Sequence, residues 1–283
     1  MYKEIYAEGI IFMNLEIMEM ANIFWPALSD SWFNVIWGVI FCVINFAMII
    51  ACFHFFGRIG MFTWIAIATI IANILVVKVV EYFTLYSTLG NVFYGSIFLS
   101  TDILTEHYGK KEAKRSIILG FAADLILIVA MQMGLAFRPF ANDQWAGQVQ
   151  GAMEILFGLT PRIVAGSLLA YLVSQFLDIT IFSKIRKATK TKHLWMRNNG
   201  ATLLSQIFDT LIFVVVAFAG AQGYSFDALW GIFITTYVLK AFVALLDTPF
   251  IYLSKHVKHG VLVGEDTNPY PEVWNKLCHR EKK

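Results

Sequence analysis

The sequence is dominated by long apolar stretches, each close to the length at which a helix crosses a lipid bilayer. A spanning helix needs about 20 mostly apolar residues. Seven stretches approach that length: 34–56, 61–80, 88–106, 115–136, 162–182, 199–220 and 228–253. The third is the weakest, because it contains the acidic residues Asp102 and Glu106. The pattern predicts an all-α integral membrane protein, a bundle of six to seven transmembrane helices.

Composition agrees with this class, because 58% of the residues are hydrophobic and only 15% are charged. Soluble domains are usually about 45–50% apolar and about 25% charged, so part of this apolar surface must face lipid. The net charge of +2 is small and gives no support to nucleic-acid binding. Cys42, Cys52 and Cys278 form no CxxC pair, and we therefore expect no metal knuckle and no redox pair. We also expect no metal site of another kind and no cofactor.

Basic residues favour one side of the predicted bundle. Between the stretches, and counting Arg115 at the start of the fourth, eleven lie on one side and only Arg138 lies on the other. The positive-inside rule assigns the basic loops, and with them the C-terminus, to the cytoplasm. Seven spans would then place the N-terminus outside.

Three further segments complete the predicted organisation. Residues 1–33 contain apolar and acidic residues at helical spacing and no cleavage site, which favours a helix at the membrane interface over a signal peptide. Residues 34–253 form the transmembrane domain, and 254–283 form a polar cytoplasmic tail. Within the transmembrane domain, Trp145–Phe157 is amphipathic, and we interpret it as an additional re-entrant or interfacial helix.

One motif occurs twice. Residues 170–182 read AYLVSQFLDITIF and residues 201–213 read ATLLSQIFDTLIF, with seven of thirteen positions identical, including Ser-Gln-x-x-Asp. The two copies lie in consecutive spans of opposite direction, so they enter the membrane inverted. Inverted repeats that meet within the bilayer are typical of transporters.

Polar side chains inside the stretches indicate where a solute could pass. A charged group in hydrocarbon costs about 2.5–3.5 kcal/mol on insertion scales, so such groups face the bundle interior. Asp102 and Glu106 share a helix face because they are four residues apart, as do the Gln-x-x-Asp pairs of the repeated motif. A polar cavity is the expected result. The polar groups are Asn73, Lys78, Asp102, Glu106, Asp124, Gln175, Asp178, Gln206, Asp209, Lys240 and Asp247.

Simpler interpretations of some of these residues stay open. Lys240 and Asp247 could pair only to hold helices together, Asp124 could be a structural partner, and Lys78 could reach the outer interface. Tyr171 could stack on a planar ligand or simply pack. No GxSxG, HExxH, P-loop or dinucleotide fingerprint is present, so we expect the protein not to be an enzyme.

Five long segments follow one another in a recognisable order across residues 34–253. They are ANILVVK (72–78), STDILTEHYGKKEAKRS (100–116), GAMEILFGLTPRIVAGSLLAYLVSQFLD (151–178), HLWMRNNGATLLSQIFDT (193–210) and TTYVLKAFVALLDTPFIY (235–252). Together they closely resemble the signature of the queuosine precursor transporter family, also called the vitamin uptake transporter family.

The resemblance implies import of queuosine precursors across the inner membrane of bacteria, for salvage of tRNA queuosine. These precursors are 7-cyano-7-deazaguanine and 7-aminomethyl-7-deazaguanine, with queuine in some members. The implied partners are this small molecule and the lipid bilayer, with no nucleic acid; a homo-oligomer stays open. The family is described as a six-span bundle similar to capture subunits of energy-coupling importers. The alternative is therefore a capture subunit of an ATP-driven importer, with a separate ATPase module, for another vitamin-like ring compound.

The chemistry of a 7-deazaguanine suggests which residues bind it. Its adjacent N–H and amino donors suit a carboxylate, so our hypothesis gives this edge to Asp178 or Asp209, with the glutamines of the repeated motif completing the contacts. Asp102 and Glu106 could take a cationic aminomethyl group or a coupling proton. The candidate substrate-binding residues are Asn73, Asp102, Glu106, Glu154, Arg162, Tyr171, Gln175, Asp178, Asn198, Gln206, Asp209 and Lys240.

Overall fold

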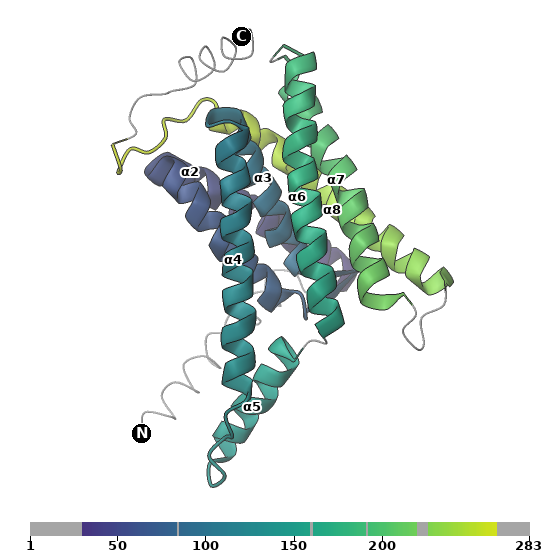
Figure 1. Cartoon of the computed structure of the whole chain (residues 1–283). Helices are drawn as coiled ribbons and strands as arrows, with labels where there is room; N and C mark the ends of the chain where they lie inside the picture. Colours follow the sequence, from purple (N-terminus) through teal and green to yellow (C-terminus); the bar gives the residue numbers. More distant parts are fainter. Residues whose placement is uncertain (1–29, 84, 159–160, 191, 220–225, 265–283) are drawn as a thin grey trace.

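The computed structural model describes residues 30–83, 85–158, 161–190, 192–219 and 226–264, and they form a helical bundle with one small β-hairpin (Figure 1). The helices and strands are α2 (Asp30–Leu75), β1 (Val79–Tyr82), β2 (Leu85–Thr88), α3 (Gly90–His107), α4 (Lys110–Leu135), α5 (Gln144–Phe157), α6 (Pro161–Ala188), α7 (Leu194–Phe218) and α8 (Phe226–Ser254). The predicted interfacial helix in residues 1–33 lies almost entirely outside the described residues, and α2 already begins at Asp30.

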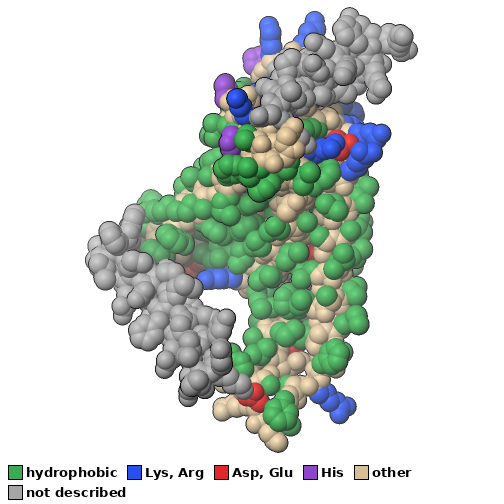
Figure 2. Space-filling view, turned by 90° about the vertical axis from the view of Figure 1, so that its left-hand side faces the viewer, with side chains coloured by type: hydrophobic (Ala, Val, Ile, Leu, Met, Phe, Trp, Pro, Cys, Tyr) green, Lys and Arg blue, Asp and Glu red, His purple; other side chains and the backbone are tan. Residues whose placement is uncertain are grey.

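Five of the described helices, α2, α4, α6, α7 and α8, are long and apolar enough to cross a membrane. Large apolar side chains remain exposed along them, among them Ile126 at 69%, Val129 at 56% and Leu245 at 55%. In the space-filling view, hydrophobic side chains cover the middle of the molecule and basic side chains gather at one end (Figure 2). A continuous apolar band of this kind requires lipid around it, so the chain is a multi-pass membrane protein.

Helix α2 reverses direction at Gly57, whose φ of 55° and ψ of −131° are not helical. Glycine tolerates this left-handed backbone, which side chains with a Cβ rarely adopt. Phe41 before the reversal and Trp64 after it both contact Phe93 of α3, with ring centroids 5.7 and 6.4 Å apart. A straight helix would hold Phe41 and Trp64 about 35 Å apart. The predicted stretches 34–56 and 61–80 therefore correspond to the two antiparallel halves of α2.

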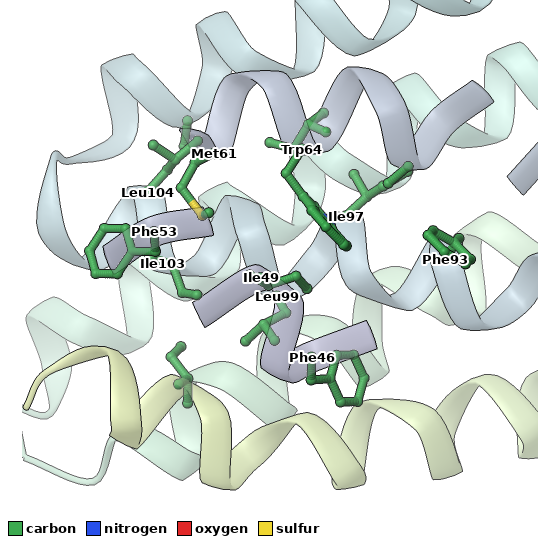
Figure 3. Close-up of a cluster of buried hydrophobic side chains, with 14 of the residues drawn as sticks. Phe46, Ile49, Phe53, Met61, Trp64, Phe93, Ile97, Leu99, Ile103 and Leu104 are labelled. Atoms are coloured by element: carbon green, nitrogen blue, oxygen red, sulfur yellow. The ribbon is translucent and has the colours of Figure 1, made fainter. Parts of the chain in front are cut away.

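Helix α3 lies inside the bundle, in contact with α2, α4, α6 and α8. Apolar side chains from both halves of α2, such as Ile49 and Met61, pack around Ile97 and Ile103 of α3 (Figure 3). Every residue of α3 from Ser96 to His107 is buried. Because α3 exposes so little surface, it can contain acids and hydroxyls that a lipid-facing helix could not, which explains why its stretch was the weakest by hydropathy.

The β-hairpin is a departure from the all-α prediction. Strands β1 and β2 pair antiparallel, with Val79 opposite Thr88 and Tyr82 opposite Leu85. Aromatic and β-branched residues in both strands favour extended backbone, and Phe83 supplies a positive φ of 58° at the turn. The predicted stretch 61–80 was therefore wrong at its C-terminal end, because its last residues are apolar but form a strand.

Helix α5 confirms the predicted amphipathic helix, although its position relative to the membrane stays a prediction. None of its residues is buried, and it packs beside α4, where the Gln132 side chain donates to the Phe157 carbonyl at 2.7 Å. At the other end of the bundle, the chain after α8 returns to the α2 reversal. The Val261 and Leu262 amides donate to the His54 and Phe55 carbonyls at 3.1 and 2.9 Å, so the predicted tail begins as an ordered segment.

Candidate substrate-binding cavity

A cavity of about 600 Å³ lies in one half of the bundle, within the size range of small-molecule sites. Its walls come from the second half of α2, the β-hairpin, the beginnings of α3, α6 and α8, the end of α7, and Asp124 in the middle of α4. The α3–α4 and α6–α7 connections, where basic residues gather in the loops and in the adjoining helix ends, lie at the opposite ends of these helices. The cavity therefore occupies the half of the bundle that is remote from the basic end.

The cavity floor is built around Asp209 of α7. Its carboxylate forms an ion pair with Lys240 of α8 and accepts hydrogen bonds from Tyr94 at 2.7 Å and Ser174 at 2.9 Å. The Lys240 ammonium also lies 4.8 Å from the centroid of the Tyr94 ring. Asp209 is 2% exposed and Lys240 is 9% exposed. Both charges are thus satisfied by the protein, and the pair links α3, α6, α7 and α8 at the floor.

A second carboxylate lies in the cavity wall. Asp124 of α4 accepts a hydrogen bond from the Asn73 amide at 2.7 Å. Within the described ranges, Asp124 has no cation partner. It lines both the main cavity and an adjoining pocket of about 70 Å³. Unlike Asp209, Asp124 can offer its second oxygen to a ligand.

Tyr171 of α6 lies in the same wall because α4 carries a glycine opposite it. A Cβ at Gly120 would lie 2.3 Å from the Tyr171 hydroxyl oxygen, so only glycine leaves room for the ring there. The hydroxyl donates to the Ile117 carbonyl at 3.3 Å. The Tyr171 and Tyr94 rings meet edge to face, with centroids 6.3 Å apart, and they present aromatic surface to the cavity.

Beneath the floor, polar side chains continue between α3, α6, α7 and α8. Thr101 donates to Gln175 at 3.2 Å. Next to this contact, the carboxyl groups of Asp102 and Asp178 face each other, and Ser205 donates to Asp178 at 3.0 Å. These side chains are all fully buried. They form a polar layer between the cavity and the basic end.

The basic end is closed by an ion cluster around Glu106 of α3. Its carboxylate contacts Arg197 at 2.5 Å, Lys255 at 3.0 Å and Arg186 at 3.6 Å. Arg186 also donates to the Thr105 carbonyl at 2.7 Å. Since these cations come from α6, α7 and the end of α8, the cluster holds the helices together and blocks the polar layer from that side.

The repeated motif has a reciprocal structural role. Ser174 of the first copy donates to Asp209 of the second at 2.9 Å, and Ser205 of the second copy donates to Asp178 of the first at 3.0 Å. The inverted arrangement of the two copies in α6 and α7 produces this exchange. The motif thus joins the two helices, and the sequence alone did not indicate that its serines and aspartates bind across the copies.

The structure brings four of the predicted site residues to the cavity: Asn73, Tyr171, Asp209 and Lys240. Six others lie within the bundle, between the floor and the basic end: Asp102, Glu106, Gln175, Asp178, Asn198 and Gln206. The remaining two lie apart from both. Glu154 of α5 accepts a hydrogen bond from Gln150 at 2.9 Å, and Arg162 donates to the Val216 and Ala219 carbonyls at the end of α7.

Two features of the cavity were missed or left open by the sequence. Tyr94 looked like one more aromatic residue in an apolar stretch, and no spacing rule connects it with Asp209. Asp124 was a candidate structural partner, and its contact with Asn73 bridges separate helices. The alternative pairing of Lys240 with Asp247 is wrong, because Asp247 instead accepts a hydrogen bond from Asn198 at 2.6 Å.

Comparison with known sequences decides the family. The sequence model of the vitamin uptake transporter family matches residues 88–254. The chain belongs to the vitamin uptake transporter family. The family match extends from the end of β2 to the end of α8, so it covers the cavity floor, the polar layer and most of the ion cluster. It leaves out α2 and therefore Asn73.

Three relatives extend this comparison. A Bacillus subtilis (strain 168) protein named "Probable queuosine precursor transporter" is 44% identical over 224 residues, 79% of this chain and 95% of the relative. The "Queuosine precursor transporter" of Escherichia coli (strain K12) is 29% identical over 147 residues, 52% of this chain and 62% of that protein. A Haemophilus influenzae protein, again named "Probable queuosine precursor transporter", is 24% identical over 165 residues, 58% and 66% of the two chains. No solved structure matches this vitamin uptake transporter family member significantly.

Proposed function

We propose that this chain imports queuosine precursors, 7-deazaguanines such as 7-cyano- and 7-aminomethyl-7-deazaguanine, across the bacterial inner membrane for salvage of tRNA queuosine. The names of the three relatives support this substrate class. The structural observation that carries the proposal is a cavity whose walls include the Asp124 carboxylate, the Asn73 amide and the rings of Tyr94 and Tyr171. Nothing in the comparisons favours the alternative of a capture subunit in an ATP-driven importer.

Asp124 is the best candidate for reading the donor edge of the substrate. A deazaguanine presents adjacent N–H and amino donors, which a carboxylate accepts in charge-assisted hydrogen bonds. The sequence hypothesis gave this role to Asp178 or Asp209. Asp178 lies beneath the cavity, and Asp209 is already engaged with Lys240, Tyr94 and Ser174. Asp124 holds Asn73 with one oxygen and leaves the other for the ligand.

The remaining cavity groups suit the other parts of a planar purine analogue. The tyrosine rings of Tyr94 and Tyr171 supply apolar surface for its faces. The Asn73 amide carries an oxygen as well as the nitrogen that binds Asp124, so it can contact a second edge. No metal or cofactor is needed for this recognition, and transport leaves the substrate chemically unchanged.

The proposed topology has seven membrane segments: the two halves of α2, then α3, α4, α6, α7 and α8. The basic end supports a cytoplasmic location for the α3–α4 and α6–α7 loops and for the C-terminus. The cavity then faces the outside, and the ion cluster around Glu106 closes the cytoplasmic side. The described conformation is the outward-facing state of an alternating-access cycle, and import requires the cluster to open.

A host that cannot synthesise deazaguanines provides the direct test. Expression of this chain with a low supply of 7-cyano-7-deazaguanine should restore queuosine in tRNA. The Asp124→Asn variant should raise the KM for uptake on the order of tenfold to a hundredfold, since a hydrogen bond to a charged group contributes about 1.5–3 kcal/mol. Asp227→Asn, an exposed acid at the start of α8, is the matched control and should behave as wild type.

Two results would contradict the proposal. If the membrane-inserted protein restored no queuosine with 7-cyano-7-deazaguanine, 7-aminomethyl-7-deazaguanine or queuine, the substrate class would be wrong. If uptake were restored and Asp124→Asn left its KM unchanged, the assignment of the donor-edge contact to Asp124 would be wrong.

A further inference from the structure

The buried acids of the bundle divide into two groups by their partners. Glu106 and Asp209 contact cations. Asp102, Asp178 and Asp247 are at most 1% exposed, and none of them has an ion-pair partner in the part of the chain that the structure describes. An acid that is buried without a cation must be stabilised in another way, by hydrogen bonds or by a proton of its own.

Asp102 and Asp178 form the most unusual contact of this group. Their carboxyl groups face each other from α3 and α6, and among the described residues Asp102 has no other hydrogen-bond partner. Two carboxyl groups can share a hydrogen bond only when one of them carries the proton. Two ionised carboxylates in the same contact would repel each other strongly away from water.

Among the described residues, no neighbouring helix supplies a cation that could replace this proton. Besides Asp178, the charged groups that act on Asp102 are two further acids, Asp247 of α8 and Glu106 of α3 itself, while the α8 cation Lys240 is paired with Asp209. The α7 side contributes the hydroxyls of Ser205 and Thr202. Arg186 and Arg197, from α6 and α7, are bound to Glu106.

Helices α4 and α2 also pack against α3. Their described cations do not pair with Asp102 or Asp178 either. The Lys114 ammonium of α4 lies over the Phe176 ring, 5.9 Å from its centroid. The α2 cation Arg58 lies 3.6 Å from Glu112 of α4. The contact between Asp102 and Asp178 therefore depends on a proton.

We propose that Asp102 and Asp178 together form a proton-binding site that couples import of the substrate to inward movement of one proton. This inference rests on the proposed function. The site lies between the cavity floor and the Glu106 cluster. Helices α3 and α6 carry both the proton site and two residues of the floor, Tyr94 and Ser174, so movement at one level is transmitted to the other.

Proton binding and substrate transport are coupled because α3 and α6 can make the described contact only while the Asp102–Asp178 pair holds a proton. In the described state the pair holds a proton that entered from the cavity side, and the two carboxyl groups are in contact. When the Glu106 cluster opens, the pair meets cytoplasmic water and releases the proton there. The two carboxylates then repel, the empty protein returns to the outward-facing state with both of them ionised, and the described contact between α3 and α6 re-forms there only after another proton binds from the cavity side. Each cycle thus carries one proton and one substrate inward, and no bond of the substrate changes.

The test uses the purified full-length chain in proteoliposomes with labelled 7-cyano-7-deazaguanine. Three conditions are compared: an inward proton gradient, an inward Na⁺ gradient at equal pH, and exchange against unlabelled substrate inside with no gradient. Wild type should accumulate substrate only with the proton gradient, up to about tenfold for one pH unit, since a tenfold ratio of either species has the same free energy. It should exchange substrate in the absence of a gradient.

The variants Asp102→Asn and Asp178→Asn should lose accumulation and keep exchange, because an amide preserves the contact without a titrating proton. Asp227→Asn is the matched control and should accumulate substrate as wild type does. Retained exchange also shows that a variant is folded. A second measurement needs no variant: adding substrate to wild-type proteoliposomes in weak buffer should make the external medium more alkaline, by one proton for each substrate taken up.

Three outcomes would overturn the coupling site: accumulation driven by Na⁺ instead of protons, full accumulation in both Asn variants, or substrate uptake by wild type without external alkalinisation. A failure of the proposed function looks different. In that case the wild-type protein would show neither uptake nor exchange of any of the three precursors.

Discussion

The two copies of the Ser-Gln-x-x-Asp motif make the same contact with each other and different contacts with everything else. Each serine donates to the aspartate of the other copy, at 2.9 and 3.0 Å. Asp209 then faces a cation, Lys240 of α8, whereas Asp178 faces another acid, Asp102 of α3. The local motif is symmetric, and the neighbouring helices give its two aspartates different charge environments.

This difference separates two roles within one helix pair. The aspartate at the cavity floor is neutralised by a permanent protein charge, the Lys240 ammonium, and needs no proton. The aspartate beneath it has no such charge and depends on a proton. A repeated motif therefore does not have to mean a repeated function, because the function of a buried acid is decided by the group opposite it.

The largest expected effect comes from removing Lys240, the cation that neutralises Asp209 in the second copy of the motif. Lys240→Ala leaves Asp209 buried and unpaired, and breaking a buried pair in this way costs about 3–5 kcal/mol. We expect a large fall in the thermal unfolding temperature of the purified protein and loss of uptake. The double variant Lys240→Met with Asp209→Asn should recover most of the stability. A Lys240→Ala protein as stable as wild type would show that the ion pair does not hold the floor together.

Substitution of Asp102, which faces Asp178 of the first copy, should change the stability of the protein far less. Asp102→Asn removes no cation partner and keeps a polar side chain of the same size, so the free energy of unfolding should change by less than about 1 kcal/mol. The unfolding temperature should stay close to that of wild type. A destabilisation as large as that of Lys240→Ala would mean that Asp102 is a structural anchor.

The smallest expected quantity is the difference between two matched losses of stability, and it tests the symmetry of the motif. Ser174→Ala and Ser205→Ala each remove one hydrogen bond of the reciprocal exchange, which should cost about 1–3 kcal/mol because both hydroxyls bind carboxyl groups. The two losses should agree within about 0.5 kcal/mol in matched unfolding measurements. A clear difference between them would indicate that one copy of the motif holds α6 and α7 together and the other does not.

Hydropathy and charge along the chain were sufficient to predict where the long helices lie in the sequence. The predicted stretches 115–136, 162–182, 199–220 and 228–253 correspond to α4, α6, α7 and α8. The weak third stretch is the buried helix α3, and the amphipathic segment before α6 is α5. The basic loops gather at one end, as their alternation predicted. These features depend on the composition of single segments, so they can be read without knowledge of the fold.

Which groups meet was decided only by the tertiary structure. Lys240 pairs with Asp209 across 31 residues and Asn73 with Asp124 across 51 residues, and no periodicity within one segment predicts a contact between helices. Several predicted site residues lie outside the cavity for the same reason: a polar residue inside a span must face the interior, but its depth and partner depend on packing. The sequence by itself determined that this chain spans a membrane and carries buried acids. The packing of the helices decided which acid meets a cation, which meets a proton, and which lies open to a ligand.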